Sequence, residues 1–155
     1  MSEGVNCAGP AGHIPEFSPG RKAPVVIDTN IVLDLFVFAD PATRAVRSAL
    51  EDGALRWLAT TAMRDELERV LAYAQIAPRL AFYRLSAQDV LAVFDRHSQR
   101  VEAPVKAPVT CKDPDDQKFI DLAVLHQAML LSKDKAVLCM KKRLLALAVK
   151  AQIAI

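Results

Sequence analysis

Short apolar segments alternate along this chain with longer segments of helical periodicity, and this alternation limits the folds open to it. The first apolar segment, Val25–Ile27, is β-branched throughout, which is typical of a strand buried on both faces. Further short strands are predicted at residues 55–59, 100–105, 129–132 and 152–155. Helices are predicted within residues 31–38, 42–52, 61–74, 78–99 (two helices), 113–127 and 134–150. Strands that alternate with helices predict an α/β fold with a parallel sheet.

Length and composition fit one folded domain preceded by a leader. The chain has 155 residues, 52% of them hydrophobic, which is enough for one core. Residues 1–22 differ from the rest, because they hold four of the five glycines and three of the nine prolines. We therefore predict a flexible leader at residues 1–22 and a folded domain at residues 23–155.

The charge balance and the cysteines exclude several classes of protein. A formal net charge of +2 excludes a domain that binds nucleic acid by electrostatics alone, but not a nucleic-acid enzyme with acidic catalytic residues. Three cysteines at unrelated spacings predict neither a disulfide framework nor a zinc site, so we expect a reducing, cytoplasmic location. No apolar run approaches the ~20 residues of a membrane span, and no signal peptide is recognised.

Two aspartates follow predicted strands. Asp28 comes directly after Val25–Ile27, and Asp134 lies two residues after the strand at 129–132. Because the carboxyl ends of parallel strands share one edge of the sheet, both acids are expected there. Carboxylates brought close together repel one another strongly unless a cation lies between them. Their oxygens suit Mg²⁺ or Mn²⁺, so the sequence predicts a divalent-cation site at this edge.

Two helices offer further acids. At about 100° per residue, Glu66 is the acid of its helix closest to the buried stripe. Asp116 lies on the inward side of the helix that begins near Asp113, whereas Asp113 itself is better explained as the N-cap. Simpler explanations stay open for the others: Asp28 and Asp134 each precede a helix that they could cap, and Glu66 could extend to solvent. The joint placement of four acids favours a functional site.

Four segments that carry these acids resemble, in order, the motifs of PIN-domain ribonucleases. The resemblance is closest to the bacterial branch described as toxin components of toxin–antitoxin pairs, and it covers about residues 24–155. The segments are Pro24–Leu33, Thr61–Leu71, Cys111–Ala123 and Leu130–Lys135. The resemblance implies a three-layer α/β/α sandwich with a central parallel sheet. It also implies hydrolysis of RNA phosphodiesters with Mg²⁺ or Mn²⁺, and a small antitoxin protein as partner.

The resemblance also implies roles for individual residues. The acids that would bind metal and catalyse cleavage are Asp28, Glu66, Asp116 and Asp134. Ser132, with Thr29 or Asn30, matches polar positions that orient the first and fourth acids, and Asp113 supports the third motif. Cations beside the acids are candidates for holding RNA phosphates, although each alone is more simply ordinary surface charge: Arg64, Lys112, Lys133 and Lys135.

Other functions compete with the nuclease. A PIN-like domain without turnover, acting through protein or RNA association, is the main alternative, and the four acids argue against it. A phosphatase of the haloacid dehalogenase type needs a second Asp where Asn30 stands, and no P-loop motif is present. The apolar residues of Ile76–Phe94 fit an antitoxin surface, a homodimer contact or simple core packing.

Overall fold

The computed structural model describes residues 22–155, so the predicted leader lies outside the described residues apart from Lys22. Five strands form one sheet in the order β3-β2-β1-β4-β5, and every neighbouring pair is parallel. The strands are β1 (Ala23–Ile27), β2 (Leu55–Ala59), β3 (Ser98–Arg100), β4 (Met129–Leu131) and β5 (Ala151–Gln152).

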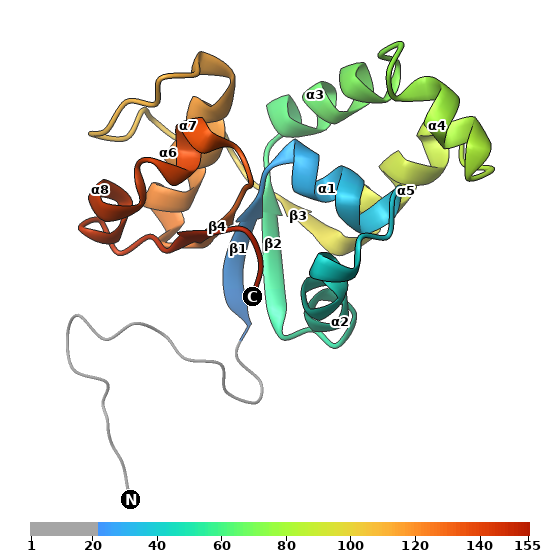
Figure 1. Cartoon of the computed structure of the whole chain (residues 1–155). Coiled ribbons are helices and arrows are strands. Elements are labelled where there is room, and N and C mark those ends of the chain that lie inside the picture. The colour runs from blue at the N-terminus through green and yellow to red at the C-terminus, as the bar shows by residue number, and fades with distance from the viewer. Residues whose placement is uncertain (1–21) are drawn as a thin grey trace, which may run out of the picture.

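Helices cover both faces of this sheet (Figure 1). On one side lie α1 (Thr29–Phe36), α2 (Arg44–Glu51), α3 (Thr61–Leu71), α4 (Ala77–Phe82) and α5 (Ala87–His97). On the other side lie α6 (Gln117–His126), α7 (Lys135–Leu138) and α8 (Lys141–Leu145). Two 3₁₀ turns, η2 (Pro41–Thr43) and η3 (Pro114–Asp116), lead into α2 and α6. The predicted three-layer α/β/α sandwich with a central parallel sheet is confirmed.

Local sequence signals account for several element boundaries. The predicted strand at 55–59 coincides with β2, and Ser86 with Asp89 forms a complete capping box at the start of α5. Gly53 follows α2 with a φ of +79°, a left-handed conformation that glycine adopts without strain.

Several predicted boundaries differ from the structure, and three of them concern strands or a divided helix. The strand predicted at 100–105 lies at Ser98–Arg100, where it pairs with Trp57–Ala59, and Pro104 lacks the N–H that a longer ladder would need. The last strand is Ala151–Gln152 rather than 152–155, because its partners are Leu130 and Leu131. The helix predicted at 134–150 is divided into α7 and α8.

The core extends over both faces of the sheet, and the part of it next to the site lies where β1 and β4 run side by side under α6. Val25, Val26 and Leu130 have no exposed surface, and Phe119 of α6 is 1% exposed. The register pairs Ile27 with Leu131, so the residues that follow these two strands leave the sheet at the same level. Among residues 22–155, no helix has the length and apolar character needed to cross a bilayer.

Candidate metal centre

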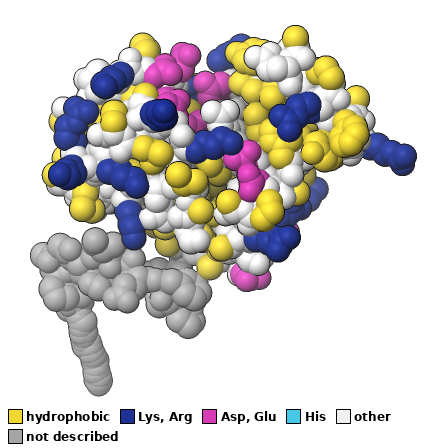
Figure 2. All heavy atoms as spheres, viewed as in Figure 1, with side chains coloured by type: hydrophobic (Ala, Val, Ile, Leu, Met, Phe, Trp, Pro, Cys, Tyr) yellow, Lys and Arg dark blue, Asp and Glu magenta, His cyan; other side chains and the backbone are white. Residues whose placement is uncertain are grey.

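Three carboxylates converge at the carboxyl edge of the sheet. One oxygen from each of Asp28, Asp116 and Asp134 lies within 4.8 Å of the other two. Asp28 directly follows β1, Asp134 directly precedes α7, and Asp116 ends η3 where α6 begins. The register of β1 with β4 places the first two acids together, and the packing of α6 on both strands brings the third. Figure 2 shows acidic side chains gathered between the parts of the surface formed by α7 and α3.

Ser132 links the first and fourth acids of the predicted set. Its buried hydroxyl donates to Asp28 Oδ2 at 2.7 Å and accepts the Asp134 backbone N–H at 3.1 Å. Asp28 makes no side-chain cap to α1, although it occupies the N-cap position. Asp134 does cap its helix, since its Oδ1 accepts the Ala136 N–H at 2.9 Å. Capping therefore accounts for one oxygen of Asp134 but not for the position of Asp28.

Asp116 has a carboxylate oxygen to which the described residues donate no hydrogen bond. Its Oδ2 is buried and has no hydrogen-bond partner among the described residues. Burial, and then the facing carboxyl of Asp134, raise the pKa of Asp116 to about 8, with smaller contributions from Asp28 and Asp113. Burial also raises the pKa of Asp28, although the hydrogen bond from Ser132 opposes this rise. A cation with oxygen ligands would complete the bonding of Asp116 and neutralise the cluster, so these residues fit Mg²⁺ or Mn²⁺.

Glu66 lies beside this cluster but outside the group of three. Thr29 Oγ1 donates to Glu66 Oε1 at 2.6 Å, and Lys118 Nζ lies 3.0 Å from Glu66 Oε2. The role of Thr29 or Asn30 in orienting the first and fourth acids stays a prediction; in the structure α1 packs against α3, and the Thr29 hydroxyl contacts Glu66. Sequence reasoning missed Lys118, whose only sequence signal was its position two residues after Asp116.

The remaining supporting residues occupy the edge of the site. Asn30 is exposed, at the start of α1. Asp113 is the N-cap of η3, and its Oδ1 accepts the Asp115 N–H at 2.9 Å. Asp113 therefore shapes the turn that presents Asp116 and adds to the negative charge near it.

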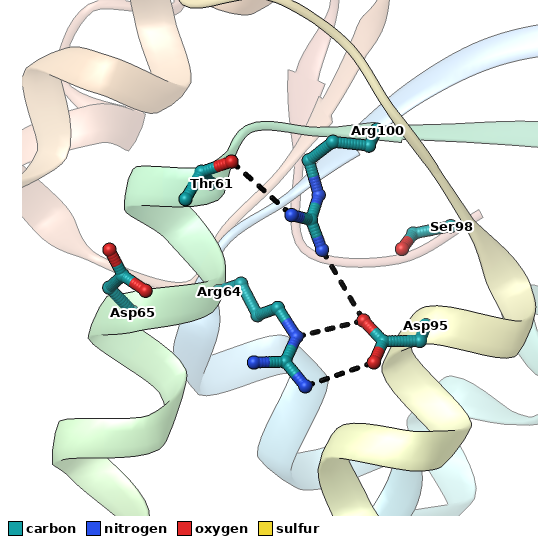
Figure 3. Close-up of a pocket in the computed structure, with 6 residues that line it drawn as sticks. All are labelled: Thr61, Arg64, Asp65, Asp95, Ser98 and Arg100. Carbon is teal, nitrogen blue, oxygen red and sulfur yellow. Dashed lines mark hydrogen bonds and ion pairs between the residues drawn. The ribbon is translucent and has the colours of Figure 1, made fainter.

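Two of the four predicted phosphate-binding cations, Arg64 and Lys133, form ion pairs with carboxylates. Arg64 donates twice to Asp95, at 2.9 Å each, and Arg100 donates to the same carboxylate at 3.3 Å (Figure 3). These side chains line a hollow of about 480 Å³ together with Thr61 and Ser98. Arg64 holds the pKa of Asp95 below its usual value, mainly through these hydrogen bonds.

One of the three predicted lysines forms an ion pair, whereas the other two form none with the described residues. Lys133 Nζ lies 2.8 Å from Oδ2 of Asp34, a buried aspartate of α1. Lys112 and Lys135 are exposed, and neither forms an ion pair with another residue of the described part of the chain. Of the four predicted cations, these two are therefore the ones available to an incoming anion.

Comparison with known protein families gives a match to the PIN domain. The model of the PIN domain matches residues 24–136, a stretch that contains every acid of the cluster. The chain belongs to the PIN-domain family. PIN domains are generally metal-dependent nucleases, and the three clustered acids of this PIN domain are compatible with metal binding. A comparison with curated proteins gives no match.

Proposed function

We propose that this PIN domain is a divalent-metal-dependent endoribonuclease and the toxin of a toxin–antitoxin pair that acts in the cytoplasm. The observation that carries the proposal is the convergence of Asp28, Asp116 and Asp134, with Asp116 Oδ2 buried and without a partner among the described residues. Such an arrangement is costly for a protein that has no cation to bind. Membership of the PIN-domain family supports the nuclease class.

The three acids would hold Mg²⁺ or Mn²⁺ through their carboxylate oxygens. The cation would supply an acidified water as nucleophile and would offset negative charge on the phosphate. The role of Ser132 is to orient, because its hydroxyl keeps Asp28 and Asp134 in one arrangement. The buried strands behind these acids exclude water from one side of the cluster, which strengthens its electrostatic interactions.

Glu66 is proposed as the fourth acid of the site. Each of its oxygens accepts one hydrogen bond, from Thr29 and from Lys118, and keeps a further lone pair. Because Glu66 lies outside the group of three acids, its direct contribution to metal binding would require its carboxylate to move toward that group. Without such a movement, Glu66 acts by fixing the positions of Thr29 and Lys118 at the rim.

RNA is the proposed substrate, and exposed cations beside the acids would hold its phosphates. Lys112 and Lys135 are proposed for this role first, because both are exposed. Arg64 and Lys133 would have to give up Asp95 and Asp34 before they could bind a phosphate. We therefore expect substitutions of Lys112 and Lys135 to weaken RNA binding more than substitutions of the two paired cations.

A small antitoxin is the proposed protein partner. The segment predicted to contact it, Ile76–Phe94, is divided: Leu80, Val90 and Phe94 are buried in the core, whereas Phe82 is 79% exposed. Tyr83, whose ring lies 5.2 Å from that of Phe82, is also exposed, and so is Tyr73. These aromatic side chains support a contact surface around α4, for which an antitoxin and a second copy of this chain are the alternatives.

Cleavage of RNA by the purified full chain tests the proposed function. A mixed RNA pool would be incubated with Mn²⁺, with Mg²⁺ and with chelator, using wild type, Asp28→Asn and Asp116→Asn. Asp52→Asn is a matched control, because Asp52 is an exposed aspartate at the end of α2. We expect metal-dependent cleavage that both site substitutions abolish and the control retains.

Two results would contradict this function. If the folded protein binds Mn²⁺ in calorimetry yet cuts no RNA of the pool, the domain is a binding module without turnover. If cleavage survives both Asp28→Asn and Asp116→Asn, the activity does not come from this site.

A further inference from the structure

Two thiols far apart in the sequence meet at one backbone carbonyl. Cys111 Sγ lies 3.4 Å from the Ala136 carbonyl oxygen, and Cys139 Sγ lies 3.3 Å from the same atom. Both thiols are free, and each donates its S–H to this oxygen. The two sulfurs can therefore be no farther apart than the sum of these two distances, although η3, α6, β4 and α7 separate them in the sequence.

The two thiols differ in their access to solvent. Cys139 is exposed at the end of α7, whereas Cys111 is buried with 5% of its surface exposed. Burial raises the pKa of the Cys111 thiol, which keeps it protonated and slow to react with an oxidant in solution. An oxidant that arrives from solvent therefore meets Cys139 first, with Cys111 placed beside it as the second thiol.

We propose that Cys111 and Cys139 form a reversible disulfide when a hydroperoxide oxidises the protein. In the first step, Cys139–SH and ROOH give Cys139–SOH and ROH, so the peroxide O–O bond is reduced by two electrons. In the second step, the Cys111 sulfur attacks the sulfenic sulfur, the S–S bond forms and the OH group leaves as water with the Cys111 proton. A thiol reductant restores both cysteines.

This bond would join the two segments that present Asp116 and Asp134. Cys111 precedes the η3 turn, and its backbone N–H is held by Gln117 Oε1 at 2.6 Å, directly after Asp116. On the other side, Ala136 donates its N–H to Asp134 Oδ1 while its carbonyl receives both thiols. Forming an S–S bond of about 2.05 Å removes both S–H donors from that carbonyl and draws the two sulfurs, with their segments, toward each other.

The consequence is a change in the spacing of the acids. Ligand oxygens that lie within 4.8 Å of one another tolerate little displacement of one segment against the other. A misplacement of about 1 Å at a reacting centre costs about 100-fold in rate, so we expect the oxidised protein to lose activity. The disulfide itself is independent of the proposed function, whereas this loss of cleavage rests on it. Disulfides that form transiently in a reducing compartment commonly have such a sensing role.

Peptide mapping of the full chain tests the bond. The reduced protein would be treated with a slight excess of hydrogen peroxide, its remaining thiols alkylated, and its digest analysed by mass spectrometry. We expect a peptide that links Cys111 to Cys139, in wild type and in Cys7→Ser, and its loss after treatment with dithiothreitol. A Cys139 that ends as sulfinic acid without a cross-link, or that pairs with Cys7 or with a second chain, would overturn the proposal.

Metal binding and cleavage test the consequence. After oxidation we expect Mn²⁺ affinity in calorimetry to fall about 10-fold and RNA cleavage to fall about 100-fold, with recovery on reduction. Cys139→Ser should keep both properties in the presence of peroxide, and an unchanged thermal melt would show that the oxidised wild type remains folded. A disulfide that leaves Mn²⁺ affinity and cleavage unchanged would overturn its regulatory role. If the reduced protein cuts no RNA, the peptide map and the Mn²⁺ affinity still decide the proposal.

Discussion

Replacing Asp116 with Asn should stabilise the metal-free protein at alkaline pH. The raised pKa means that between pH 3.8 and about 8 the native state holds a proton that the unfolded chain has lost. Stability therefore falls as the pH rises through this window, because folding requires Asp116 to take up a proton whose concentration is falling. Asparagine keeps the shape of the side chain and removes the charge, so it removes this pH-dependent cost.

The size of the effect follows from the pKa and the burial. A rise from 3.8 to about 8 corresponds to at most about 6 kcal/mol, at about 1.4 kcal/mol per pKa unit. The side chain of Asp116 is almost completely buried, at 6% exposure, yet relaxation and water entry reduce the cost of a buried charge. We expect Asp116→Asn to raise the free energy of unfolding by about 2–3 kcal/mol at pH 8, and by less than about 1 kcal/mol at pH 5.

Urea unfolding with chelator, at pH 5 and pH 8, measures this difference. Asp115→Asn is the matched control, because the neighbouring Asp115 is exposed, and it should change the free energy of unfolding by less than about 0.5 kcal/mol at either pH. A gain from Asp116→Asn that is equal at both pH values, or a loss at pH 8, would refute the reasoning. Mn²⁺ at 100 times its Kd should stabilise wild type by about 2.7 kcal/mol and the variant by much less.

Four further substitutions distinguish residues of the site from residues that stabilise the fold. Ser132→Ala should lower Mn²⁺ affinity in calorimetry about 10-fold, because it removes the hydroxyl that holds two of the acids; an unchanged affinity would contradict this. Ser86→Ala should lower the free energy of unfolding by about 1 kcal/mol, because the capping box with Asp89 is lost. It should leave Mn²⁺ affinity unchanged, and a change in that affinity would contradict the prediction. Lys118→Met and Glu66→Gln should each lower the free energy of unfolding in urea. The double variant should lose less free energy of unfolding than the sum of the two single losses, by about 0.5 kcal/mol or more. Strict additivity would show that the two side chains are not coupled.

The sequence by itself determined the layers of this fold and the residues at the ends of its central strands. Val25–Ile27 was predictable because a short, β-branched apolar run suits a strand buried on both faces. The strand at 55–59 was predictable because it is short and mostly apolar, although Arg56 interrupts it. The start of α5 was predictable because a capping box satisfies its own N–H groups locally. Since parallel strands end at one edge, the meeting of Asp28 and Asp134 also followed from the alternation of strands and helices.

Only the tertiary structure decided which atoms in and around the site contact one another. Thr29 turns toward Glu66, Lys118 pairs with that same acid, and Cys111 reaches the carbonyl that also receives Cys139. Each of these contacts joins residues on different elements, and the side-chain positions depend on how α1, α3, α6 and α7 pack. Local patterns encode the period, burial and capping of each element, because those depend on neighbours in the chain. The distance between two side chains on separate elements depends on how the whole core is filled, which no short segment of sequence specifies.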